Sequence, residues 1–293
     1  MIDGGSSDNT LNVIETYRPH LHYFISEKDS GQSEAINKGL RQATGDIVTW
    51  LNSDDYYEPD TLEQVAQLFR NNPDAGFVHG KARLFGKNKK DIVVGTDRNL
   101  QIHEYLAYMR FPQPASFFRK EAMAAAGPLN EQLHYAMDFE LVVKSLLSGF
   151  KPVRSSSVFA HYRLHENSKT NHDLRFIEEW SRVVFRVLSS FAGGEKYAEQ
   201  LKLLTSMEIM DSKIFDLKVR LNDDVLRALF LEHLHIRFHY QYRALQVKDA
   251  KQTAAYIRKN YPREFAEKGY GKYTTRLKIL PTFVLALLRK FST

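Results

Sequence analysis

Short apolar runs alternate with helical patterns over the first 165 residues of the chain. Runs rich in β-branched and aromatic residues, bounded by turn residues, are typical of strands and lie at 21–26, 47–51 and 76–85. Between them, apolar residues recur at helical spacing, and candidate capping residues precede these stretches: Asp8, Ser30 or Ser33, and Asp60 with Glu63. The alternation predicts an α/β fold with a mainly parallel sheet and helices on both of its faces.

Residues 171–250 have a different pattern, in which long apolar periodicities with charges between them predict amphipathic helices. We therefore expect a first domain over residues 1–170 and a mostly helical extension over residues 171–293. His233, His235 and His239 lie in this extension. Because no nearby acid completes a typical metal site, we interpret them as ordinary helix surface.

The basic excess of the chain lies in its last 43 residues, which carry 10 Lys and Arg against 2 Asp and Glu. The first 250 residues carry 31 against 33, which argues against a nucleic-acid partner. The segment TTRLKILPTFVLALLRKF has about ten apolar residues with basic flanks, too few for a membrane span. It suits a helix on an anionic membrane surface or, equally, a helix docked on the protein itself.

The overall composition suits a globular protein, with 43% hydrophobic residues and no cysteine among 293 residues. Disulfides and thiolate metal sites are therefore excluded. No signal-peptide pattern opens the sequence. We expect a cytoplasmic protein, either free or peripheral on the inner face of a membrane.

Two polar motifs directly follow predicted strands. DGGSSD at residues 3–8 follows Met1 and Ile2, which resemble the end of a strand, and NSDD at residues 52–55 follows the strand at 47–51. In open α/β sheets, ligands bind beyond the carboxyl ends of the strands. Adjacent carboxylates such as Asp54 and Asp55 repel each other, and a cation between them relieves that repulsion. Oxygen ligands at this place favour Mg²⁺ or Mn²⁺ carrying a diphosphate.

Four segments, in this order, resemble the family-two glycosyltransferases: IDGGSSDNT, EKDSGQSEAINKGLRQATGDIVTWLNSDDYYEPDTL, FPQPASFFRKEAMAAAGPLNEQLHYAMDFELVVKSLLSGF and HYRLHENSKT. The resemblance covers residues 1 to about 170. It implies the A-type glycosyltransferase fold, and it makes residues 1–170 a catalytic domain that lacks the first strand–helix unit of the family. From this we expect the chain as written to be poorly stable and weak in nucleotide binding.

The resemblance also implies a nucleotide-sugar site. Asp3 matches the strand-end aspartate that contacts the base, and Asp29, Asn37 and Lys38 match positions near the nucleotide. Relatives often place an arginine at the position of Ile36, and Lys38 is a possible substitute for its contact with the diphosphate.

The acidic motif matches the family's metal site. Asp55 would be the direct ligand of the divalent cation (Mg or Mn), and Asp54 would hold the ribose or the metal's water shell. His165 fits the place where relatives put a histidine against the metal or the diphosphate.

On the acceptor side, Asp138 matches the family's catalytic base. Glu140, two residues further along the same predicted helix, would face elsewhere. Gln113 would line the acceptor site.

The resemblance implies transfer of a sugar from a nucleotide-sugar donor to a glycan or lipid-linked acceptor in cell-surface polysaccharide synthesis, with inversion and with a divalent cation as cofactor. The alternative is a non-catalytic relative that binds a nucleotide sugar or a partner protein.

Overall fold

The computed structural model describes residues 1–86, 92–166, 168–169, 173–205 and 217–279. They form two compact units. Unit one contains residues 1–101 and 109–169 with a short segment at 217–220, and unit two contains residues 102–108, 173–205 and 221–279. Residues 102–108, which the sequence analysis placed in the first domain, cluster with the helical unit. The predicted division near residue 170 remains a prediction.

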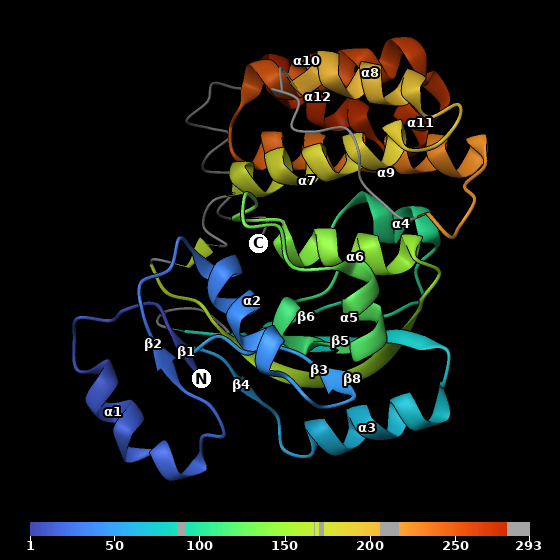
Figure 1. The fold of residues 1–293 in the computed structure, drawn as a ribbon. Coiled ribbons are helices and arrows are strands. Elements are labelled where there is room, and N and C mark those ends of the chain that lie inside the picture. The colour runs from blue at the N-terminus through green and yellow to red at the C-terminus, as the bar shows by residue number, and fades with distance from the viewer. Residues whose placement is uncertain (87–91, 167, 170–172, 206–216, 280–293) are drawn as a thin grey trace. The chain divides into compact units, whose positions relative to one another are not determined.

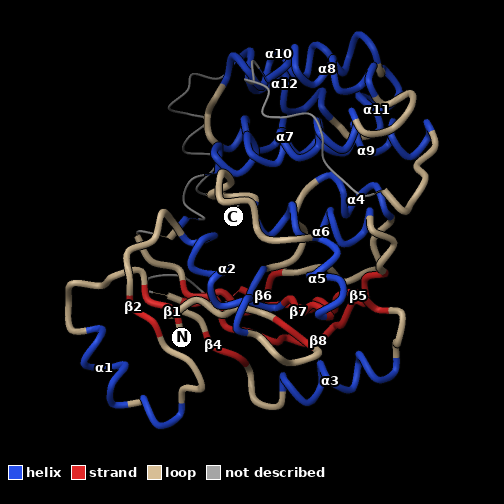
Figure 2. Tube along the Cα trace, in the orientation of Figure 1, coloured by secondary structure: helices blue, strands red, loops and turns tan. Residues whose placement is uncertain are grey.

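Unit one is an α/β unit, as the sequence predicts (Figure 1). Its strands are β1 (Ile2–Asp3), β2 (Ile25–Ser26), β3 (Ile47–Val48), β4 (Tyr56–Tyr57), β5 (Ala75–Phe85), β6 (Ile92–Val94), β7 (Ser116–Arg119) and β8 (Lys151–Arg163). Its helices are α1 (Thr10–Thr16), α2 (Gln32–Gln42), α3 (Thr61–Asn71), α5 (Lys120–Ala126) and α6 (Met137–Leu147), with short 3₁₀ turns at Arg18–His20 and Gln113–Ala115. The strands form the red layer of Figure 2.

The directions of the strands correct one part of the prediction. Strands β1 and β2 form a parallel pair, and the larger sheet has the order β3-β7-β5-β8-β4, with β6 on β5. In the described residues β5 and β8 run parallel, but the other four pairings of the larger sheet are antiparallel. The sheet is therefore mixed rather than mainly parallel. Alternating elements predict the layers of a fold, whereas the order of the strands is set by contacts distant in sequence.

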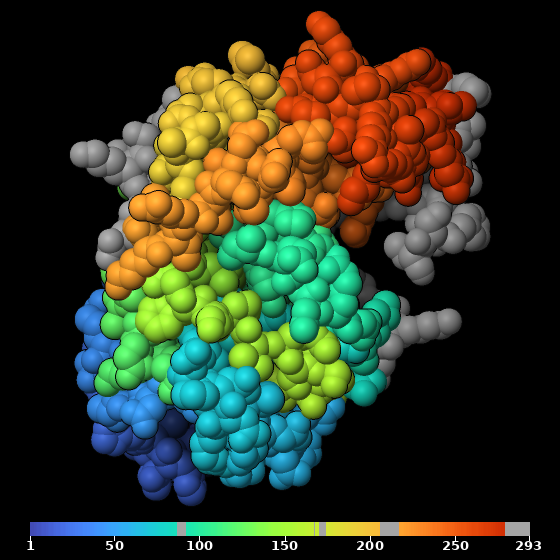
Figure 3. Space-filling view, turned by 90° about the vertical axis from the view of Figure 1, so that its right-hand side faces the viewer, coloured from blue at the N-terminus to red at the C-terminus, as the bar shows by residue number. Residues whose placement is uncertain are grey.

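Helices cover both faces of the larger sheet in unit one (Figure 1). On one face, Val65 and Phe69 of α3 pack into a buried cluster with Val78, Phe117 and Phe159 of three central strands. Burying a side chain of this size contributes about 1.5–3 kcal/mol. The outer side of α3 forms part of the molecular surface (cyan in Figure 3), where Leu62 is exposed.

The beginnings of α2 and α3 differ from the predicted caps. Neither helix has a side-chain cap: Gly31 precedes α2, and Asp60 precedes α3 in the left-handed conformation (φ 62°). The Ser33 hydroxyl instead donates to the Leu133 carbonyl. Thr61 donates to the Phe159 carbonyl at 2.8 Å, which fixes the start of α3 to β8. The long-range contacts have replaced the local caps.

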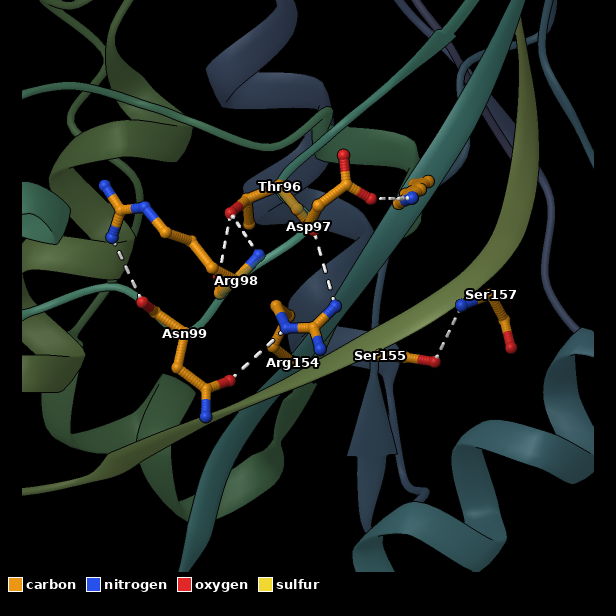
Figure 4. Close-up of polar contacts among 8 residues, drawn as sticks. Thr96, Asp97, Arg98, Asn99, Arg154, Ser155 and Ser157 are labelled. Carbon is orange, nitrogen blue, oxygen red and sulfur yellow. Dashed lines mark hydrogen bonds and ion pairs between the residues drawn. The ribbon is translucent and has the colours of Figure 1, made fainter.

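The segment after β6 is bonded to the two long strands of unit one (Figure 4). Lys81 of β5 forms an ion pair with Asp97. Arg154 of β8 donates to the Asn99 side chain at 3.3 Å and to the Thr96 carbonyl at 3.5 Å. The Lys81 hydrogen bond lowers the pKa of the Asp97 carboxyl. These contacts hold residues 96–99 against the sheet.

The described part of unit two is helical (blue in Figure 2). Its helices are α4 (Ile102–Ala107), α7 (Asp173–Ser189), α8 (Glu195–Thr205), α9 (Asp223–Arg243), α10 (Val247–Asn260), α11 (Pro262–Glu267) and α12 (Tyr270–Ile279). Within the described residues no helix combines the length and the apolar character needed to cross a membrane. Most of the segment TTRLKILPTFVLALLRKF lies within residues 280–293, outside the described residues, so its predicted helix remains a prediction.

His233 corrects the interpretation of the histidine cluster. It is fully buried rather than on the helix surface, and its ring nitrogens lie 2.8 Å from the Ala107 carbonyl and 2.9 Å from the Ser181 hydroxyl. Burial lowers its pKa to about 4. His235 contacts the Tyr270 hydroxyl at 3.1 Å. These are packing contacts inside unit two.

A close contact at Gly80 makes β5 sensitive to one methyl group. The register of β5 against β8 shifts between His79 and Lys81, and a Cβ at Gly80 would lie 2.4 Å from the Phe159 ring and 2.8 Å from the Ser157 carbonyl. We predict that Gly80→Ala lowers the free energy of unfolding by about 1–3 kcal/mol, because the buried strand cannot move aside. Urea denaturation measures this change.

Gly45→Ala is the matched control. The nearest atom to a Cβ at Gly45 is the Ile47 carbonyl oxygen at 3.5 Å, an ordinary contact. Its unfolding free energy should stay within about 0.5 kcal/mol of wild type. Equal stability of the two variants would contradict the predicted close packing at Gly80.

Candidate functional site

The acidic motif forms the turn between β3 and β4. The Asp55 amide donates to the Asn52 carbonyl at 3.1 Å, which closes the turn. Asp55 is only 7% exposed, whereas the Asp54 side chain is 35% exposed. The two neighbouring carboxylates thus occupy different environments.

Strand β8 brings a distant segment to this turn. Tyr56 and Tyr57 pair with His161 and Ala160, and the Arg163 amide then donates to Asp55 Oδ1 at 2.9 Å. The Asp55 side chain therefore accepts a bond from the strand that pairs with β4.

The residues that follow β8 reach Asp54. His165 Nε2 lies 3.1 Å from Asp54 Oδ2, and the Arg163 side chain donates to the Asp54 carbonyl at 3.2 Å. The structure therefore brings Asp54, Asp55 and His165 together, although His165 is more than 100 positions away in the sequence.

The buried position of Asp55 raises the pKa of its carboxyl to about 6. Loss of hydration is the main cause, the Arg163 amide opposes it, and the Asp54 carboxylate adds to it. A nearby positive charge would lower this pKa and offset the cost of burial.

The donor atoms at this turn suit a hard divalent cation. Mg²⁺ binds through one or two carboxylates completed by substrate phosphates, and Mn²⁺ accepts the same oxygen ligands. Among the described residues, no group of three or more His, Asp and Glu side chains is placed to hold a metal ion. Asp54, Asp55 and His165 therefore fit a cation only if a bound phosphate supplies further ligands.

Asp3 uses its carboxylate to build the first strand-end loop. It accepts hydrogen bonds from the Gly5 and Ser6 amides and from the Ser6 and Ser26 hydroxyls, at 2.5–3.1 Å. These bonds, with that of Ser26 the strongest, lower the pKa of Asp3 to about 2. They fix the DGG loop to the end of β2.

Asp29 approaches the same loop from the next strand end. It accepts a bond from the Gly31 amide at 3.0 Å, and its carboxylate lies against Gly4. A Cβ at Gly4 would lie only 2.5 Å from Asp29 Oδ2. The second residue of the DGG motif therefore has to be glycine for Asp29 to occupy this place.

Helix α2 carries Asn37 and Lys38, and both already have partners within the protein. Asn37 is buried and exchanges hydrogen bonds with the Leu129 backbone at 2.8–2.9 Å and donates to Glu131 at 3.0 Å. Lys38 Nζ lies 2.8 Å from both Glu27 and Glu34. A contact from Lys38 to a diphosphate would require exchange of one of these partners.

Asp138 and Glu140 take different roles at the start of α6. Glu140 is buried and forms an ion pair with Lys144 at 2.9 Å. Asp138 is partly exposed, and its Oδ1 accepts a bond from the Phe139 amide at 2.8 Å. Of the two acids, Asp138 is the one whose position is compatible with contact to a bound substrate.

Gln113 lies beside the strand that leads into the acidic turn, where its side chain donates to the Trp50 carbonyl at 2.9 Å. Three further residues surround the turn and were not predicted: Gln32, Asn52 and Lys169 form a connected set of hydrogen bonds. Asn52 was visible in the NSDD motif. Nothing in the sequence indicates the contact of Lys169, because its partner lies 137 positions away.

The raised pKa of Asp55 predicts that its charge works against folding. Below about pH 4 the carboxyl is protonated in both states and has no effect. Between about pH 4 and 6 the unfolded chain releases the proton first, so stability falls as pH rises, by up to about 3 kcal/mol. We predict that Asp55→Asn is more stable than wild type at pH 7.5 in metal-free buffer, with no difference at pH 4, as measured by urea denaturation.

For Asp3 we predict the opposite effect on stability: its charge stabilises the folded protein. Its folded pKa lies below the usual value of 3.8, so its contribution is complete above about pH 4 and is lost as pH falls toward about 2. Asp3→Asn should therefore be less stable than wild type at pH 7.5, and the difference should narrow as pH falls below 4. If both substitutions shift stability in the same direction at pH 7.5, the two assigned environments are wrong.

Known proteins resemble both the sequence and the fold. The family model Glycosyl transferase family 2 matches residues 1–124. An uncharacterized glycosyltransferase of Mycobacterium tuberculosis is 29% identical over 154 residues, which are 50% of this chain and 56% of that protein. The chain thus spans little more than half the length of this relative.

Two solved structures resemble the fold. S. aureus TarS, residues 1–349 in complex with UDP-GlcNAc, gives a TM-score of 0.57 at 17% identity over 87% of this chain and 70% of that one. The mannosyltransferase PcManGT from Pyrobaculum calidifontis, in complex with GDP-Man and Mn²⁺, gives a TM-score of 0.52 at 16% sequence identity. The match covers 99% of this chain and 76% of that one. The sequence match and the fold agree with the segments singled out above: residues 1–124 match the family model of glycosyltransferase family 2, and the chain has the A-type glycosyltransferase fold.

Proposed function

We propose that this protein transfers a sugar from a nucleotide-sugar donor to a glycan or lipid-linked acceptor, with inversion at the sugar carbon and with a divalent cation at the acidic turn. The observation that carries the proposal is the meeting of Asp54, Asp55 and His165. Two strand-end acids and an imidazole from a segment more than 100 residues away gather at one place in an enzyme-family fold.

The cation would be held by Asp55 and His165, with Asp54 beside them. Asp54 Oδ2 lies 3.1 Å from His165 Nε2, so Asp54 would hold the imidazole beside the ion. A structural relative was solved with GDP-Man and Mn²⁺. When bound, the cation would supply positive charge to the leaving diphosphate.

The nucleotide would lie over the first two strand ends. Asp3 and Asp29 hold the DGG loop there. Asn37 and Lys38 would support this side from α2. The contact of Asp29 with Gly4 gives the two loops one fixed arrangement.

Asp138 would act as the base of the transfer. The acceptor hydroxyl oxygen forms a bond to the sugar carbon, the bond from that carbon to the diphosphate oxygen breaks, and the nucleoside diphosphate leaves with the electron pair. The hydroxyl proton passes to the Asp138 carboxylate. Attack from the face opposite the leaving group inverts the configuration, and a positioned carboxylate contributes about 10²–10⁴ in rate. Gln113 would border the acceptor.

We predict that Asp138→Asn retains nucleotide-sugar binding and lowers turnover at least ~10²-fold, because an amide cannot accept the proton. Asp55→Ala should instead weaken Mn²⁺-dependent nucleotide binding. The measurements are isothermal titration with UDP- and GDP-sugars, with and without Mn²⁺, and release of the nucleoside diphosphate.

Glu63→Gln is the matched control, an exposed acid on α3 that forms an ion pair with Arg70. It should leave binding and turnover unchanged. A non-catalytic relative would show binding that depends on Asp55 but no transfer that depends on Asp138. Wild-type transfer by Asp138→Asn would remove it as the base.

A further inference from the structure

Lys169 joins three segments of unit one that are far apart in the sequence. Its ammonium group donates to Gln32 Oε1 at 2.7 Å and to the His134 carbonyl at 2.9 Å. It also lies 5.8 Å from the centre of the Tyr135 ring. Gln32 is the first residue of α2, and His134 lies four residues before Asp138.

A chain of hydrogen bonds leads from Lys169 to the acidic turn. Gln32 Nε2 donates to Asn52 Oδ1 at 2.8 Å, and Asn52 Nδ2 lies 3.3 Å from Asp55 Oδ2. We name Lys169, Gln32, Asn52 and Asp55 the Lys169 chain. It ends on the carboxylate oxygen of Asp55 that the Arg163 amide does not contact.

The direction of this chain is set at Lys169. An ammonium group can only donate, so the Gln32 amide must turn its oxygen toward Lys169 and its NH₂ group toward Asn52. Asn52 in turn must present its oxygen to Gln32 and its NH₂ group to Asp55. Without the lysine, either amide could reverse and place an oxygen against its neighbour. The positive charge also strengthens the first bond of the chain.

We propose that Lys169 is a positioning residue of the transfer site. Through Gln32 and Asn52 it orients Asp55, and through His134 it holds the loop that leads to Asp138. This inference rests on the proposed function, because Asp55 is taken as the cation ligand and Asp138 as the base. Lys169 itself is assigned no contact with the donor or the acceptor.

The substitution Gln32→Glu distinguishes two roles of Lys169: orienting the side chains of the Lys169 chain, and merely tying its own segment to α2. A glutamate at position 32 keeps an acceptor for Lys169 and forms an ion pair with it, so attachment of the segment becomes stronger. However, its second oxygen would face Asn52 Oδ1, so Asn52 must reverse and turn its own oxygen toward Asp55. A residue that merely ties segments together would make Gln32→Glu neutral or stabilising, whereas an orienting chain makes it harmful to cation binding.

The test measures Mn²⁺ binding by electron paramagnetic resonance with UDP or GDP present, because the site needs phosphate ligands to complete the coordination of a cation, and Mn²⁺ without nucleotide gives the baseline. We expect Lys169→Met and Gln32→Glu each to weaken Mn²⁺ binding by about 10–100-fold, the range for residues that orient metal ligands. In the double variant the effects should not multiply, because both substitutions break the same chain. Lys169→Arg, which keeps the charge and the donors, should restore part of the affinity.

Lys151→Met is the matched control, a lysine that forms an ion pair with Asp74 on the exposed surface. It should bind Mn²⁺ as wild type does, and thermal melting should show that all variants are folded. If wild type binds Mn²⁺ in a manner that Asp55→Asn abolishes, and Gln32→Glu binds it equally well, the orienting role is wrong while the proposed function stands. If Asp55→Asn has no effect on Mn²⁺ binding, both fail.

Discussion

The burial of the Asp55 carboxylate is the constraint on which the rest of the site depends. A charge that is 7% exposed is unfavourable unless donors or a cation compensate for the lost water. The protein supplies two donors, the Arg163 amide and the Asn52 side chain, and the pKa still rises to about 6. The compensation is incomplete, which is the condition expected of a group that receives a positive ligand.

The same constraint explains why segments from so many parts of the sequence meet here. The Arg163 amide reaches Asp55 only because β8 pairs with β4 in one register, and this register also delivers His165 to Asp54. Helix α2 meets the turn through Gln32 and holds the loop before Asp138 through Asn37. The acidic turn and the loop before Asp138 are therefore both fixed to one helix.

The sequence predicted the parts of this site that depend on local pattern, and it missed those that depend on pairing. The α/β class, the place of Asp55 in a turn after a strand and the different environments of Asp138 and Glu140 follow from periodicity and motif. The order of the strands and the contact of Lys169 depend on pairing between segments far apart in the sequence, as the 137 positions between Gln32 and Lys169 show. Periodicity contains no information about such contacts, because a strand pattern is the same whichever neighbour it pairs with.

In the DGGSSD and NSDD motifs, aspartate has two different structural roles. A carboxylate offers about four acceptor sites. Asp3 fills them with four donors of its own loops, so its charge is stabilised inside the protein and its oxygens hold the DGG turn. Asp55 receives two donors, so part of its capacity is left for a ligand. The family resemblance treats Asp3 as a base contact, but a carboxylate with four internal bonds can gain a new one only by releasing an old one. The backbone of the loop that Asp3 organises is therefore better suited to receive the nucleotide than its side chain.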